Sequence, residues 1–263
     1  MQLNIFGNKE QLREKASELI KQRGLVDFVD ILTIDKVQKD IIIQKLLTLQ
    51  THIFDLDAFG EKNRDIKEGK NNRTIQELWS QIKTDLKKDF RLSETAIRSS
   101  LQNINDFMTM ELEMRKGKSP TEIDGHTFYA MKICDVQLQR KLIEGELGKH
   151  IENSGRDTLD MLGEIIDDID DLEEDLLSNN SNRLLICLEI AGYESTEKEY
   201  MSLAKRLVTE YFSSQDIDIQ LGYKIIEAAK EISDKLITIK IFNKRNETSQ
   251  ILYNILSRQG NKE

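Results

Sequence analysis

Apolar residues recur every three or four positions along almost all of the 263-residue chain, and no long segment alternates apolar and polar residues with a period of two. A spacing of three to four places apolar side chains on one face of an α-helix, whereas a period of two is typical of a β-strand. The chain contains a single proline, Pro120. The pattern therefore predicts an all-α fold.

The same periodicity locates the individual helices. They are expected at residues 9–22, 35–58, 74–90, 94–116, 120–148, 154–178, 183–191, 197–212, 217–241 and 247–258, with a polar loop at 60–73. The start at residue 120 is predicted from Ser119 as N-cap, Pro120 in the first helical position and Glu122 closing a capping box. No Pro-, Gly- or Ser-rich linker and no repeat of fixed period divides the chain, so a single domain over residues 1–263 is expected.

Charge and cysteine usage exclude several classes of protein. A formal net charge of −9 argues against a general nucleic-acid binder, because phosphate backbones are bound by clustered Lys and Arg. The two cysteines, Cys134 and Cys187, both lie within helical patterns, so a disulfide framework has little support and a reducing cytoplasm is expected. No run of about 18 apolar residues is present, so no membrane span is expected.

The most informative segment is an acidic one, MLGEIIDDIDDLEEDLLSNN. In it, Asp167, Asp168 and Asp171 spell Asp-Asp-x-x-Asp, and Asp175 follows one helical turn later. At about 100° per residue, Glu164 joins Asp168, Asp171 and Asp175 in one narrow stripe. Neighbouring carboxylates repel one another and oppose the helix dipole, which a bound cation would relieve. Oxygen ligands without His or Cys favour Mg²⁺. A solvated acidic face on an amphipathic helix is the alternative interpretation.

Two further elements are weaker candidates for the same chemistry. Asp55 and Asp57 end an apolar helix, but two positions correspond to about 200° on a helix, so only one of them faces a given ion unless the helix unwinds locally. A basic loop containing Arg64 follows. Lys132 lies in the helix before the aspartate motif, where it could bind a phosphate oxygen, although a solvated lysine is the more common case.

Taken in chain order, these elements resemble the trans-isoprenyl diphosphate synthase family, within the class I isoprenoid synthases that include terpene cyclases. The resemblance covers about residues 40–190 and runs through LQTHIFDLDAFGEKNRDIKEGKNNRTI, MTMELEMRKGKSPTEIDGHTFYAMKICDVQL and LGEIIDDIDDLEEDL. It implies a helical bundle around a central cavity, in which the helices ending near Asp57 and Asp175 face each other. It also implies roles for individual residues. Asp167, Asp168 and Asp171 are expected to be catalytic and to bind Mg²⁺, with Asp55 or Asp57 and Asp175 as further metal ligands, and Lys132 and Arg64 are expected to contact phosphate.

The activity that this resemblance implies is Mg²⁺-dependent ionisation of an isoprenyl diphosphate, followed by cyclisation or by transfer of the prenyl group to an acceptor. It leaves open a homodimer or a heteromeric prenyl synthase partner. Three features depart from the family: the first motif reads Asp-Leu-Asp-Ala-Phe, Ile133 replaces a threonine, and no Gly-Gly-Lys-Arg-x-Arg element precedes residue 40. The alternatives are therefore a non-catalytic partner subunit and a helical interaction protein with an acidic solvated face.

Overall fold

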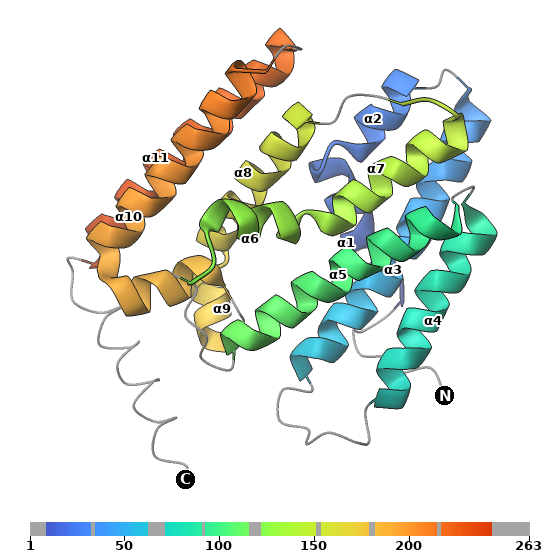
Figure 1. The fold of residues 1–263 in the computed structure, drawn as a ribbon, viewed down its shortest axis with the longest axis horizontal. Helices are drawn as coiled ribbons and strands as arrows, with labels where there is room; N and C mark the ends of the chain where they lie inside the picture. Colours follow the sequence, from blue (N-terminus) through green and yellow to red (C-terminus); the bar gives the residue numbers. More distant parts are fainter. Residues whose placement is uncertain are drawn as a thin grey trace. The chain divides into compact units, whose positions relative to one another are not determined.

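The computed structural model describes residues 9–32, 35–62, 72–90, 93–115, 122–150, 154–178, 182–214 and 217–243, which contain eleven α-helices and no β-strand (Figure 1). The helices are α1 (Lys9–Gln22), α2 (Leu25–Leu32), α3 (Lys36–Lys62), α4 (Asn72–Asp89), α5 (Glu94–Arg115), α6 (Gly125–Lys132), α7 (Cys134–Leu147), α8 (Ser154–Asp170), α9 (Leu172–Ser178), α10 (Arg183–Phe212) and α11 (Ile219–Asn243). The all-α prediction is confirmed for these ranges. The helix expected at residues 247–258 lies outside them.

The chain forms two compact units, each assembled from separate stretches of sequence. The first unit comprises Met1–Asp106 and Cys134–Ile151, and the second comprises Phe107–Ile133 and Glu152–Glu263. Each unit is therefore held together by contacts between segments that are distant in sequence. The expectation of a single domain stays a prediction, and the two units are described separately below.

In the first unit, α3 packs against α1, α2, α4 and α7. Helix α2 was not expected from the sequence pattern. It arises because Gly24 adopts a left-handed conformation with φ of 64°, which ends α1 and redirects the chain. The residues after Gly24 then bury four apolar side chains at helical spacing, Leu25, Phe28, Val29 and Leu32.

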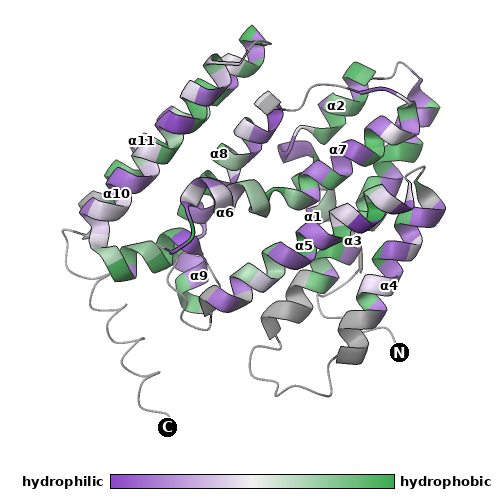
Figure 2. Ribbon diagram, in the orientation of Figure 1, coloured by the Kyte–Doolittle hydropathy of each residue, from purple (hydrophilic) through white to green (hydrophobic). Residues whose placement is uncertain are grey.

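In the second unit, α8 packs against α6, α10 and α11. Figure 2 shows hydrophobic and hydrophilic residues mixed along the helices of this unit, as is typical of amphipathic helices. In α8, the apolar side chains of Leu162, Ile165 and Ile169 are buried. The two helices predicted at residues 183–191 and 197–212 form one element, α10, with a kink at Gly192, whose φ of 74° is outside the helical range.

The helix start predicted at Ser119 and Pro120 lies outside the described residues. Glu122 and Ile123 precede the helix, and α6 begins at Gly125, with Asp124 as N-cap accepting a 3.1 Å hydrogen bond from the Thr127 backbone N–H. An aspartate in this position satisfies one of the N–H groups that have no partner within the first turn of the helix. The helix expected at residues 120–148 is moreover divided at Ile133 into α6 and α7.

The helix expected at residues 154–178 is divided at Asp171 into α8 and α9. The hydrogen bonds on either side of the break keep helical spacing: Asp171 N–H donates to the Asp167 carbonyl at 2.9 Å, and Asp175 N–H donates to the Asp171 carbonyl at 2.8 Å. The interruption is thus confined to one residue, and that residue belongs to the aspartate motif.

Candidate metal and phosphate site

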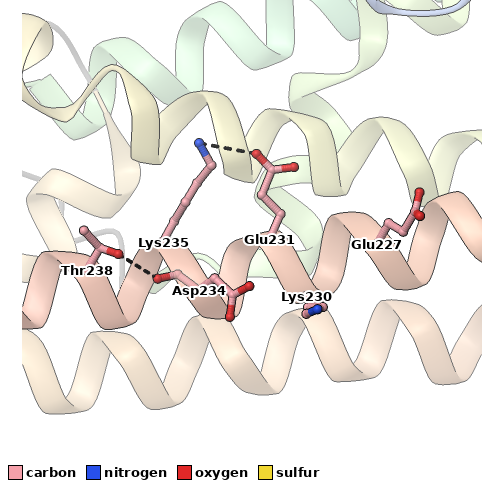
Figure 3. A pocket seen from close by; sticks show the side chains of 6 residues that line it. All are labelled: Glu227, Lys230, Glu231, Asp234, Lys235 and Thr238. Atoms are coloured by element: carbon pink, nitrogen blue, oxygen red, sulfur yellow. Dashed lines mark hydrogen bonds and ion pairs between the residues drawn. The ribbon is translucent and has the colours of Figure 1, made fainter.

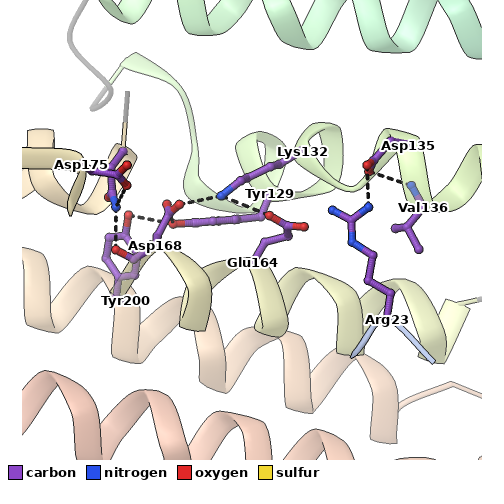
Figure 4. A network of polar contacts seen from close by, with 10 residues as sticks. Arg23, Tyr129, Lys132, Asp135, Val136, Glu164, Asp168, Asp175 and Tyr200 are labelled. Carbon is purple, nitrogen blue, oxygen red and sulfur yellow. Dashed lines mark hydrogen bonds and ion pairs between the residues drawn. The ribbon is translucent and has the colours of Figure 1, made fainter. Parts of the chain in front are cut away.

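Lys132, at the C-terminal end of α6, lies between two carboxylates of α8 (Figure 4). Its Nζ donates to Asp168 Oδ1 at 2.6 Å and is 3.1 Å from Glu164 Oε2. Glu164 and Asp168 are one helical turn apart, so they project from the same face of α8 and both reach the ammonium group. The second aspartate motif and the preceding lysine are therefore brought together within the second unit.

Both carboxylates are shielded from solvent, with exposed fractions of 8% for Glu164 and 5% for Asp168. The solvated acidic face is therefore ruled out for these two residues, although it still describes part of the helix further on. A buried charge is tolerated only when it is paired and hydrogen-bonded, and Lys132 supplies that pairing.

The other oxygen of Asp168 is bound by a tyrosine. The Tyr129 hydroxyl donates to Asp168 Oδ2 at 2.6 Å and lies 3.1 Å from the Tyr200 hydroxyl, so a buried chain of hydrogen bonds links α8, α6 and α10. The Tyr129 and Tyr200 rings meet edge to face with centroids 6.2 Å apart. Two different donors on its two oxygens fix the orientation of the Asp168 carboxylate.

Arg183, the first residue of α10, closes this buried network. It is 1% exposed and donates to the Tyr200 hydroxyl at 3.3 Å, to the Ile123 carbonyl at 3.2 Å and to Glu199 Oε1 at 2.5 Å. Its guanidinium also lies 5.6 Å from the centre of the Tyr200 ring, in range for a cation–π contact. A planar guanidinium with five donors can satisfy partners in several directions at once.

The buried groups have shifted pKa values that follow from these contacts. Burial lowers the pKa of Lys132, but the Asp168 and Glu164 carboxylates outweigh it and hold the pKa well above its ordinary value. Burial raises the pKa of Asp168, with Lys132 and Tyr129 acting in the opposite direction. Burial and the adjacent Asp168 charge together hold the pKa of Tyr129 well above its ordinary value.

The end of the aspartate motif has a different environment. Asp171 is exposed, and its pKa is raised by partial burial and by the charges of Asp175 and Glu174. Asp175 is half-buried and accepts a 2.9 Å hydrogen bond from Asn182 Nδ2. These carboxylates therefore repel one another at the junction of α8 and α9, where a cation would reduce the repulsion.

Asn182 holds this junction in place. Its Nδ2 donates to the Asp168 carbonyl at 2.6 Å as well as to Asp175, while its Oδ1 accepts from the Leu185 backbone N–H at 3.0 Å as the N-cap of α10. One buried side chain thus connects the end of α8, the start of α10 and a carboxylate of α9.

For the remaining predicted site residues, the described structure gives individual positions only. Asp167 is half-buried in α8, and Asp55 is half-buried in α3, which belongs to the first unit. The Asp57 side chain and the whole of Arg64 lie outside the described residues. The proposed facing of the two aspartate motifs across a cavity stays a prediction.

The donor chemistry of the second unit fits a hard cation. Within the described ranges, no group of three or more His, Cys, Asp or Glu side chains could hold a metal ion. Asp168 and Glu164 nevertheless already share one cation, the Lys132 ammonium, and both offer only oxygen. Mg²⁺ is usually bound through one or two carboxylates together with substrate phosphates.

A shallow hollow on α11 has a different character (Figure 3). Lys235 lies 3.3 Å from Glu231, and the Thr238 hydroxyl donates to the Asp234 carbonyl at 3.0 Å. Lys235 also pairs with Asp170 of α8. The lining residues all come from one helix, so the hollow lacks the convergent groups of a binding site.

Three residues of the network could not be recognised from the sequence. Asn182 is the last residue of the polar stretch SNNSN at 178–182, Arg183 follows it, and Tyr200 lies within a helix rich in charged residues. The only local signal is the asparagine before an apolar helix, which is typical of an N-cap. Their roles depend on contacts across the second unit.

No family model, curated protein or solved structure matches the chain. Within the described residues, each helix is either too short or too polar to cross a membrane.

Proposed function

We propose that the chain binds an isoprenyl diphosphate together with Mg²⁺ and ionises it, then cyclises the prenyl group or transfers it to an acceptor. One observation carries the proposal: the lysine and the Asp-Asp-x-x-Asp motif, which the family resemblance pairs functionally, lie within 2.6 Å of each other at Asp168. The same lysine also reaches Glu164, 3.1 Å away. Binding of a metal–diphosphate complex requires carboxylates for the metal and a positively charged hydrogen-bond donor for the phosphate oxygens, and both lie close together here.

The residues have distinct roles in this proposal. Asp168, with Asp167 and Asp171 beside it, would hold Mg²⁺, and Asp175 would add charge at the junction of α8 and α9. Lys132 would donate to a phosphate oxygen. Tyr129 keeps the Asp168 carboxylate oriented through the 2.6 Å bond to Oδ2. When bound, Mg²⁺ supplies positive charge that neutralises the departing diphosphate.

A specific observation favours a second candidate, a non-catalytic partner subunit of a prenyl diphosphate synthase. Both oxygens of Asp168 already have close donors, Lys132 and Tyr129, so this aspartate serves a structural purpose without any ligand. The first motif also departs from the family pattern, with leucine between Asp55 and Asp57. A partner subunit would retain the fold of the site and lack turnover.

The two candidates are separated by incubating the 263-residue chain with a panel of allylic isoprenyl diphosphates and Mg²⁺ and measuring the release of diphosphate. Mg²⁺-dependent release supports the enzyme. Binding is measured in parallel from thermal unfolding, where Mg²⁺ and diphosphate together should raise the midpoint by more than the sum of their separate effects. Synergistic binding without release points to the partner subunit, and merely additive shifts contradict a shared site.

A further inference from the structure

The Lys132 ammonium occupies the position of a bound cation. It lies 2.6 Å from Asp168 Oδ1 and 3.1 Å from Glu164 Oε2, between two buried carboxylates on the same face of α8. Its side chain is 20% exposed, and its Nζ lies 5.9 Å from the centre of the Tyr129 ring. The ammonium therefore offsets part of the negative charge of the two carboxylates in a place where water screens charge weakly.

We propose that Lys132 is the resident cation of this site and makes the binding of Mg²⁺ depend on diphosphate. The inference rests on the function proposed above. While Lys132 occupies Asp168 and Glu164, a second cation at these carboxylates meets an ammonium group of like charge. Moving Lys132 away without a new partner would leave a partly buried ammonium unpaired, which is costly. Diphosphate oxygens supply that partner, so the two ligands bind well only together.

The arrangement around Asp168 makes this exchange feasible. Lys132 binds Oδ1, whereas Tyr129 binds Oδ2. When Lys132 turns from Oδ1 to a phosphate oxygen, the Tyr129 hydrogen bond remains and keeps the carboxylate in position. Tyr129 is itself held by Tyr200, whose hydroxyl is 3.1 Å away. Lys132 can thus be exchanged for another cation, while Tyr129 keeps the Asp168 carboxylate oriented to bind Mg²⁺.

The test is the Lys132→Gln variant of the 263-residue chain. Titration calorimetry measures the affinity for free Mg²⁺ with and without inorganic diphosphate. The values are corrected for the complex that Mg²⁺ and diphosphate form in solution. In the wild type, diphosphate should tighten Mg²⁺ binding by about 10-fold or more. In Lys132→Gln, Mg²⁺ alone should bind about 5-fold or more tighter than in the wild type, and the tightening by diphosphate should shrink correspondingly. Lys132→Arg keeps a cation between the carboxylates and should retain weak binding of Mg²⁺ alone.

Lys235→Gln is the matched control. Lys235 pairs with Asp170 on the same helix α8, but Asp170 is about half exposed. Removal of this cation should leave both Mg²⁺ affinities unchanged, because it occupies neither Asp168 nor Glu164. A Lys235→Gln variant that tightens Mg²⁺ as much as Lys132→Gln would reduce the effect to general electrostatics and overturn the inference.

The remaining outcomes also test the inference and the proposed function separately. If the wild type binds Mg²⁺ and diphosphate synergistically but folded Lys132→Gln binds Mg²⁺ alone no more tightly than the wild type does, the role of Lys132 is overturned. The proposed function then still stands. Absence of Mg²⁺ and diphosphate binding by the wild type overturns both. If Lys132→Gln does not fold, Asp168→Asn provides the test: the lysine released from Asp168 should bind inorganic diphosphate alone more tightly than the wild type, and unchanged or weaker binding overturns the inference.

Discussion

The Tyr129 hydroxyl donates a 2.6 Å hydrogen bond to Asp168, 39 residues later in the chain, and both side chains are buried. Asp168 also accepts a hydrogen bond from Lys132. Removal of the Tyr129 hydroxyl therefore takes away one of the two donors to Asp168 and leaves Lys132 in place. The bond therefore allows the structural and the functional roles of Asp168 to be separated experimentally.

Tyr129→Phe should reduce the free energy of unfolding by about 1–3 kcal/mol, the usual consequence of leaving a buried acceptor without one donor. Tyr200→Phe should cost a similar amount, and the double variant less than the sum, because the two hydroxyls lie 3.1 Å apart in one network. Urea denaturation of the four proteins measures the coupling. Strict additivity would show that the hydroxyls act independently.

Asp171→Asn and Asp170→Asn distinguish a metal ligand from a surface acid. Asp171→Asn should abolish Mg²⁺-dependent diphosphate release, yet stabilise the metal-free fold by a few tenths of a kcal/mol, because it relieves repulsion from Asp175. Asp170→Asn removes only the partly exposed pair with Lys235, worth about 0–1 kcal/mol, and should leave release unchanged. Diphosphate release and urea midpoints with and without Mg²⁺ are the measurements. Equal, small effects of both substitutions would contradict a metal site.

Stability should fall steeply in alkaline solution. The folded pKa of Lys132 lies above the ordinary 10.5, so its contribution is fully present below that pH and is lost as pH rises towards the folded pKa. Tyr129 acts in the same direction, because the unfolded chain loses this proton near pH 10.0 while the folded chain retains it. Urea midpoints between about pH 8 and about pH 11 should decline less in Tyr129→Phe than in the wild type. Identical slopes would exclude Tyr129 as a contributor.

Two glycines of α8 should respond to alanine in opposite directions. A Cβ at Gly163 would meet nothing within 4 Å, so Gly163→Ala should stabilise the helix by about 0.5–1 kcal/mol. A Cβ at Gly155 would overlap the ring of Tyr211 and approach Leu221 within 2.8 Å. Tyr211 is buried and its hydroxyl is bound to the Asp218 carbonyl at 2.6 Å, so it cannot move freely.

Gly155→Ala should therefore cost about 1–3 kcal/mol. Thermal and urea unfolding of both variants provide the comparison, with Gly163→Ala as the control for helix propensity. A stabilised Gly155→Ala protein would show that α8 does not pack closely against α10 and α11 at this position.

The sequence by itself determined which segments are helical and which faces are apolar, because both depend on side chains within three or four positions of each other. It located most helices of the described ranges and identified the aspartate motif and Lys132. Helix ends were less certain: α6 begins at Gly125 with Asp124 as its N-cap, a cap that was not predicted.

Only the tertiary structure decided which carboxylates of the acidic helix face solvent. Glu164 and Asp171 share one stripe of the helical wheel, yet Glu164 is buried beside Lys132, whereas Asp171 stands at the break between α8 and α9. The partners of Asp168 lie 36 and 39 residues earlier in the chain. Periodicity carries no information over such distances, because the pairing depends on how α6, α8 and α10 pack around the buried charges.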